Sequence, residues 1–328
     1  MDGNNPHQKQ KIWLKLAPWF SGFLVLSGLI LLVTHFSELE HFAELLRHAK
    51  PVWLMLAALL QVTTYISVAG VWYLSLRQLG EQYSLLSLIP LGIAKLFSDQ
   101  AIPSGGVSGT AFFIAALARR GVPTQLCMAI LLLSLVAHYG AYLLATLATL
   151  FLLWLYHQAI NSWIIVLFTL FWVIAVGVPA SALWIRHLGN KELPHLLLRI
   201  PGLSKLLSAF IDAPKELLKN PVLVIVATLL HESVIVLDVA TLWVGLQVVG
   251  VHCSIWAITP AFMLASMVAT IGPIPLGLGT FEATCVSMLG VLGIPVEAAL
   301  AATLILRGFT LWLPMMPGMW MMRHALRK

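Results

Sequence analysis

Ionisable side chains stand inside long apolar stretches of this sequence, where each is costly unless it is paired or hydrated. Lys95 and Asp99 are four residues apart, so on a helix they share one face and can form an ion pair. Glu282 lies just after a Gly- and Pro-rich stretch, and Arg307 lies in the next apolar segment. Two roles are open for Glu282 and Arg307: a structural salt bridge, or headgroup binding and proton coupling.

A second group lies in the stretch HESVIVLD, which holds His231, Glu232 and Asp238. Glu232 and Asp238 are separated by roughly 120° around a helix axis, so we expect them to make different contacts. His138 and His231 have no H-x-x-x-H or H-E-x-x-H spacing. Hydrogen-bonded core histidines are therefore a better interpretation than metal ligands. We expect no metal site, no cofactor and no catalytic residue.

Two stretches interrupt the apolar segments, IPSGGVSGT at residues 102–110 and IGPIPLGLGTFEAT at residues 271–284. A helix that starts behind such a break presents free N–H groups and a positive dipole end, which favour an anion such as a phosphate. Tight turns whose glycines only permit helix packing are an equally open interpretation. Neither stretch matches the phosphate loop G-x-x-x-x-G-K-[ST]. The residues predicted to bind a lipid headgroup are Lys95, Asp99, Pro103, Ser104, Gly105, Gly106, Ser108, Glu232, Asp238, Pro275, Gly277, Gly279, Thr280, Glu282 and Arg307.

The elements that must position these residues are membrane helices, because 60% of the residues are hydrophobic and only 10% are charged. We expect spans over residues 12–33, 51–76, 124–155, 163–185, 221–246 and 298–321. Shorter apolar helices are expected over residues 85–102, 107–118, 255–271 and 278–291. These are short for a crossing, which indicates two helical hairpins that enter the bilayer and return. The predicted fold is an all-α polytopic bundle.

Basic residues are spread through short loops beside the spans, so the positive-inside rule accounts for the net charge of +6. We therefore expect no nucleic-acid partner, and we place both termini in the cytoplasm. The first span is expected to be retained, because no A-x-A cleavage pattern follows it.

An internal repeat links the two broken stretches. An offset of 172 residues pairs Pro103 with Pro275 and Gly105 with Gly277. Because the first hairpin opens to the cytoplasm and the second to the outside, the repeat is inverted, which is typical of transporters. We expect one membrane domain over residues 1–328, with repeats at about 51–155 and 221–322 and a connecting segment at about 156–220.

The motifs PIPLGLGTFEAT, LGIPVEAALAATLILRGFTLWLPMMPG and IPSGGVSGTAFFIAALARRGVP resemble the transmembrane region of lysylphosphatidylglycerol synthetases, over about residues 12–322. In two-part members, this flippase-like region moves aminoacylated phosphatidylglycerol between leaflets and a soluble domain transfers the amino acid from tRNA. This chain ends just past its last span, so the resemblance implies a stand-alone member without the transferase activity. The resemblance also places characteristic family positions at Pro103, Gly105, Gly106, Pro275, Gly277, Gly279, Glu282 and Arg307.

The expected function is lipid flipping in a bacterial inner membrane, without enzymatic activity. The expected partners are membrane lipids, either a phospholipid or a polyprenol-type amphiphile. A separate lipid-modifying enzyme is a further candidate partner. Two alternatives stay open. The chain could be a non-transporting partner of such an enzyme, or a membrane-embedded enzyme using His231 and Glu232.

Overall fold

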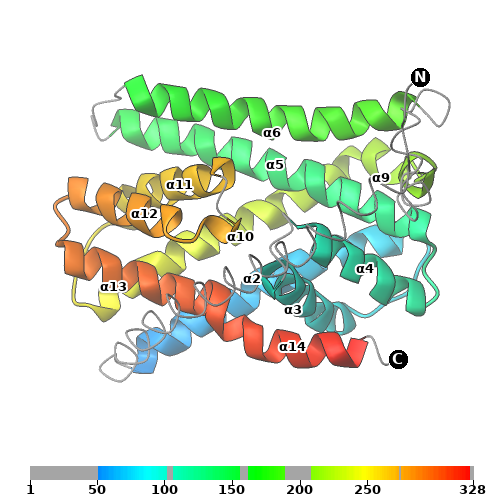
Figure 1. Ribbon diagram of the computed structural model, residues 1–328, viewed down its shortest axis with the longest axis horizontal. Helices are drawn as coiled ribbons and strands as arrows, with labels where there is room; N and C mark the ends of the chain where they lie inside the picture. The colour runs from blue at the N-terminus through cyan, green and yellow to red at the C-terminus, as the bar shows by residue number, and fades with distance from the viewer. Residues whose placement is uncertain (1–50, 102–105, 156–161, 189–207, 273–274, 326–328) are drawn as a thin grey trace, which may run out of the picture. The chain divides into compact units, whose positions relative to one another are not determined.

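The computed structural model describes residues 51–101, 106–155, 162–188, 208–272 and 275–325, all within one compact unit, Ala49–Lys328. These parts of the chain are α-helical apart from short turns and contain no strand (Figure 1). The predicted span at residues 12–33 lies outside the described residues. The prediction of an all-α, multi-pass membrane protein is confirmed.

Five helices in the described parts of the chain are long and apolar enough to cross a membrane. Each coincides within a few residues with a predicted span, since these segments are apolar almost all round their circumference. They are α2 (Pro51–Gln78), α5 (Thr124–Leu155), α6 (Ser162–Leu188), α10 (Pro221–Val248) and a last rod made of α13 (Val296–Arg307) and α14 (Leu313–Ala325).

The last rod changes its winding directly after Arg307, in the π-helical segment Gly308–Trp312. Here the N–H of Leu313 donates to the carbonyl of Gly308, five residues back. Such a turn takes up one more residue than an α-helical turn and often marks a functional site.

Two helical hairpins lie between the spans, and each is interrupted at a predicted break. The first pairs α3 (Leu85–Ala101) with α4 (Val107–Arg119), and the second pairs α11 (Ile255–Ile271) with α12 (Thr280–Val291). The last of these was predicted to begin at residue 278, which is wrong by two residues. A 3₁₀ turn at Pro275–Gly277 and the positive φ of Gly277 and Gly279 keep the backbone out of the α conformation until Thr280.

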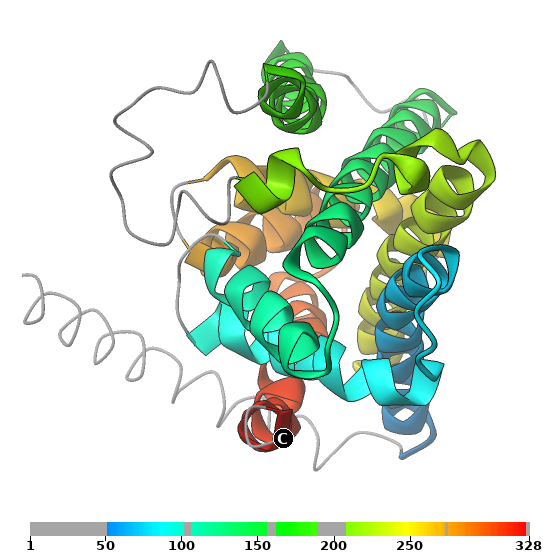
Figure 2. The same ribbon diagram turned by 90° about the vertical axis from the view of Figure 1, so that its right-hand side faces the viewer.

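Helix α10 is the centre of the packing. It lies along α2, α5 and α13, and Figure 2 shows α2 and α10 side by side. The rod's α14 packs along α3, whereas α11 packs against α12 and α5. The side of α10 away from these neighbours exposes Val222, Ile225, Leu229 and Val236, an apolar surface suited to lipid.

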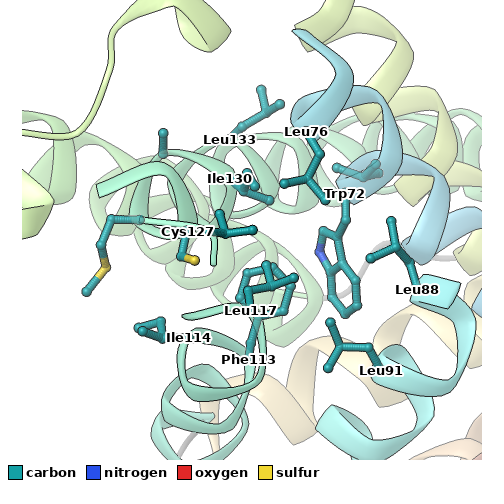
Figure 3. Packing of buried hydrophobic residues seen from close by; sticks show 14 of the residues in the cluster. Trp72, Leu76, Leu88, Leu91, Phe113, Ile114, Leu117, Cys127, Ile130 and Leu133 are labelled. Atoms are coloured by element: carbon teal, nitrogen blue, oxygen red, sulfur yellow. The ribbon is translucent and has the colours of Figure 1, made fainter. Parts of the chain in front are cut away.

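A buried apolar cluster holds the first hairpin in place (Figure 3). The rings of Trp72 on α2 and Phe113 on α4 lie 4.6 Å apart between centroids. Leu91 on α3 and Ile130 on α5 complete the contact from the other two sides. Four helices thus meet in one core, so α3 and α4 have a fixed position beside the long spans.

Glycines allow two of the closest helix crossings. A Cβ on Gly245 of α10 would lie 2.8 Å from the carbonyl oxygen of Ala302 on α13. A Cβ on Gly318 of α14 would lie 2.6 Å from the Cβ of Phe97 on α3. Small residues at such positions let membrane helices approach closely.

Candidate functional site

Asp99 joins the two arms of the first hairpin. Its Oδ1 accepts a hydrogen bond of 2.8 Å from the N–H of Gly109 in the first turn of α4, and its Oδ2 lies 2.8 Å from Nζ of Lys95. Gly106, in the left-handed conformation with φ 87°, precedes that turn. The hydroxyl of Ser108 donates to the carbonyl of Ser98 at 2.8 Å. A carboxylate therefore caps α4 at the break.

In the second hairpin, Glu282 caps α12, the helix to which it belongs. Its Oε2 accepts a hydrogen bond of 2.7 Å from the N–H of Gly279, and its Oε1 accepts one from Nε of Arg307. Arg307 also donates to the carbonyl of Leu276 at 3.0 Å and lies over the ring of Phe281, 5.0 Å from its centroid. Both ionic side chains are buried. The predicted salt bridge is present, and it ties the break to the last rod.

The two breaks thus share one arrangement that the sequence did not reveal. At each, an N–H group at the start of the second helix is bonded to a protein carboxylate, which is paired in turn with a cation. An incoming phosphate would meet this carboxylate first, and like charges repel. Three residues of the first predicted headgroup motif lie outside the described residues: Pro103, Ser104 and Gly105. In the second motif, the hydroxyl of Thr280 donates to the carbonyl of Gly277 at 3.0 Å.

Gly109→Ala is expected to disrupt the cap of the first hairpin. The new Cβ would overlap the carboxylate of Asp99, so the carboxylate must leave the N–H of residue 109. Overpacking and the lost hydrogen bond together predict a loss of about 1–3 kcal/mol, measured as a lower thermal midpoint in detergent. Gly290→Ala is the matched control, because its Cβ meets nothing within 4 Å. Equal midpoints for the two variants would show that Asp99 does not hold the hairpin.

A polar seam joins α2 to α10 halfway along both helices. Nε2 of Gln61 donates to Oδ1 of Asp238 at 2.9 Å and lies 3.0 Å from Oγ1 of Thr241. Nearly two turns further along α2, the hydroxyl oxygens of Ser233 and Ser67 are 2.9 Å apart. Asp238 therefore faces α2. Glu232 does not share this contact, as its angular separation from Asp238 predicted.

Two imidazoles face each other between α5 and α10. The ring centroids of His138 and His231 are 5.5 Å apart and their planes are nearly perpendicular. On α5, the rings of Tyr139 and Tyr142 lie 5.5 and 4.9 Å from His138. Both histidines also interact electrostatically with Lys95 of α3, so the ion pair of the first hairpin lies near this aromatic cluster.

Several buried polar atoms in this region have no hydrogen-bond partner among the described residues. They are Oη of Tyr65, Oγ of Ser134, Nε2 of His231 and Oε2 of Glu232. The expectation of hydrogen-bonded core histidines is thus not met at Nε2 of His231. Buried polar groups without partners are rare in proteins and require an explanation such as a ligand, an ion or water.

We call the residues of this region the mid-span polar cluster; they are Gln61 and Tyr65 on α2, His138 and Tyr142 on α5, and His231 and Asp238 on α10. The sequence indicated His138, His231 and Asp238 as intramembrane polar residues, but Gln61, Tyr65 and Tyr142 were missed. Their position in the middle of apolar spans was the available signal. Among the described residues, no group of three or more His, Cys, Asp and Glu side chains could hold a metal ion.

Comparison with known proteins places these features in a family. Residues 19–318 match the model of a family described as the lysylphosphatidylglycerol synthase TM region. No curated protein matches the chain. The matched range includes both hairpins, the last rod as far as Gly318, and all of the mid-span polar cluster.

Proposed function

The chain belongs to the lysylphosphatidylglycerol synthase transmembrane-region family, and on this premise we propose that it moves a polar-headed lipid between the leaflets of a bacterial inner membrane. The observation that carries the proposal is the mid-span polar cluster. Its groups come from three long apolar helices, and two of them, Oη of Tyr65 and Nε2 of His231, lack hydrogen-bond partners among the described residues. Intramembrane polar groups of this kind mark substrate pathways.

The proposed path leads a polar headgroup past α2, α5 and α10 while the acyl or prenyl tails stay in the bilayer. Gln61 and Asp238 offer an amide and a carboxylate, and Tyr65 offers a hydroxyl without a partner among the described residues. A headgroup that hydrogen-bonds to these atoms would replace the water it loses on leaving the surface. The substrate class is thus a phospholipid or another lipid with a hydrogen-bonding head.

The helix packing supports an inverted repeat within this proposal. The last helix of the second repeat, α14, packs on α3 of the first hairpin, and the last helix of the first repeat, α5, packs on α11 of the second. The first helices of the two repeats, α2 and α10, pack on each other. Two halves related by a twofold axis would exchange contacts in this reciprocal way, and substrates bind at such repeat interfaces in transporters.

Reconstitution tests the proposal. Vesicles with and without the protein receive fluorescent phosphatidylglycerol or phosphatidylethanolamine, and a membrane-impermeant reductant reports the fraction in the outer leaflet over time. We expect the protein to accelerate exchange between leaflets. Asp238→Asn should slow it at least about tenfold, because the neutral amide changes the charge at the proposed path. Asp212→Asn, on an exposed side chain outside the spans, is the control.

Exchange no faster than in protein-free vesicles, for any lipid tested, would overturn the proposal. The alternative function, a non-transporting partner of a lipid-modifying enzyme, would then gain weight. One observation favours that alternative: the ionic groups at both breaks are already bonded within the protein, as structural joints require.

A further inference from the structure

His138 lies on the inner face of α5, and its side chain is exposed. Around the helix axis, His138 lies within about 20° of Cys127, Ala145 and Thr149, and all three are buried. Leu147, on the opposite side of α5, is exposed as a lipid-facing residue should be. His138 belongs to the buried stripe and its ring faces α10, yet its surface is exposed. An accessible space therefore reaches the bundle interior at this residue.

The partner ring, His231, completes the feature. Its Nε2 is buried without a hydrogen-bond partner among the described residues, and the ring lies 5.5 Å from that of His138. Imidazole is the side chain that most readily takes up and releases a proton near neutral pH. One imidazole of the pair is exposed, and the other has a nitrogen without a hydrogen-bond partner among the described residues, so a proton can reach the pair and bind there.

Four helices, α2, α3, α5 and α10, contribute titratable side chains near the pair. The midsections of α6 and α11 carry no titratable side chain. In α4 and α13, the charged side chains lie at the helix ends. The titratable groups near the pair are Tyr65 on α2, Lys95 and Asp99 on α3, Tyr139 and Tyr142 on α5, and Glu232 and Asp238 on α10.

These neighbours limit the pair to one proton at a time. Two imidazolium rings at this distance would repel each other, and both would be repelled by Lys95. A single proton on either ring adds one positive charge within electrostatic range of the Lys95–Asp99 ion pair. That ion pair caps α4 through Gly109. Proton binding between α5 and α10 thus acts on the first hairpin.

We propose that His138 and His231 form a proton-binding site that couples lipid movement to a proton gradient across the membrane. The coupling rests on the proposed lipid transport, but the proton site itself does not. In each cycle, one proton enters from the accessible space at His138, resides on either imidazole and leaves unchanged, so no bond other than N–H forms or breaks.

The first experiment needs no lipid substrate. Protein labelled in its histidine rings is titrated from about pH 4 to pH 8 by NMR in detergent. His138→Gln and His231→Gln identify the two resonances by difference, with His187→Gln at the exposed end of α6 as the control. We expect each single variant to shift the midpoint of the remaining ring by the equivalent of about tenfold in proton affinity. Rings that titrate independently, or not at all, would overturn the proton site.

The second experiment measures coupling in vesicles that carry an imposed pH difference. Wild-type protein should enrich the labelled lipid in one leaflet, whereas the His138→Gln, His231→Gln double variant should only equalise the leaflets. A double variant that still responds to the pH difference would refute the coupling. If wild type moves no lipid at all, the proposed function fails while the titration still decides the proton site. Phe variants, which keep a planar ring, replace any Gln variant that does not fold.

Discussion

Arg307→Met is expected to lower the free energy of unfolding by about 3–5 kcal/mol, the cost of leaving a buried charge without its partner. Glu282 would remain buried in α12 with only the N–H of Gly279 as a donor. The carbonyl of Leu276 would lose its donor as well. Thermal unfolding in detergent, followed by tryptophan fluorescence, measures the loss.

Two further variants test whether the loss of stability comes from the broken ion pair or from removing an arginine as such. Arg323→Met, at an exposed position near the end of α14, should change the midpoint little. The double variant Arg307→Met, Glu282→Gln removes both charges and should recover part of the stability, because no uncompensated charge remains. If the double variant is less stable than Arg307→Met alone, the desolvated carboxylate is not the source of the cost.

Gly245→Ala is the second substitution expected to lower the stability of the protein strongly. The added Cβ would lie 2.8 Å from the carbonyl oxygen and 3.1 Å from the Cα of Ala302. Both are backbone atoms of α13, so no side chain can turn aside and the two helices must separate. Overpacking of this kind costs about 1–3 kcal/mol and sometimes more. A lowered thermal midpoint, and slower lipid exchange if the proposed function holds, would follow.

The control for this substitution is Gly177→Ala on α6, whose Cβ meets nothing within 4 Å. It should be neutral or stabilising by about 0.5–1 kcal/mol, because alanine loses less entropy in a helix than glycine. Equal effects of the two substitutions would mean that the crossing of α10 and α13 is looser than the contact with Ala302 indicates.

The helices were predictable because length and apolar composition alone decide whether a segment can cross a membrane. The ranges 124–155 and 255–271 coincide with α5 and α11 to the residue. The start of α12 was misplaced because a glycine in the sequence does not reveal the sign of its φ angle, and Gly277 and Gly279 both have positive values.

The sequence predicted two kinds of contact in the candidate site. These are contacts between residues close in the sequence, and ion pairs between the few charged residues of the membrane segments. Lys95 and Asp99 were paired from their spacing, and Glu282 and Arg307 because few charges lie in the membrane to pair with. The contact between Gln61 and Asp238 joins residues 177 positions apart, so no spacing rule reaches it. The bond from Gly109 to Asp99 depends on how the hairpin folds back, which composition does not specify.

The π-helical segment after Arg307 lies between two close helix contacts of the last rod, so the number of residues in the rod affects how both contacts fit. Ala302 meets α10 before this segment, and Gly318 meets α3 after it. Each residue of a helix adds about 100° of rotation. Because the wider turn accommodates one extra residue, deleting one residue within Gly308–Trp312 would restore regular winding and leave Gly318 facing Phe97, whereas a deletion between Leu313 and Gly318 would turn Gly318 away by about that angle. The π-helical segment thus accommodates an additional residue between the contact at Ala302 and the contact at Gly318 without changing the directions in which the two contacts face.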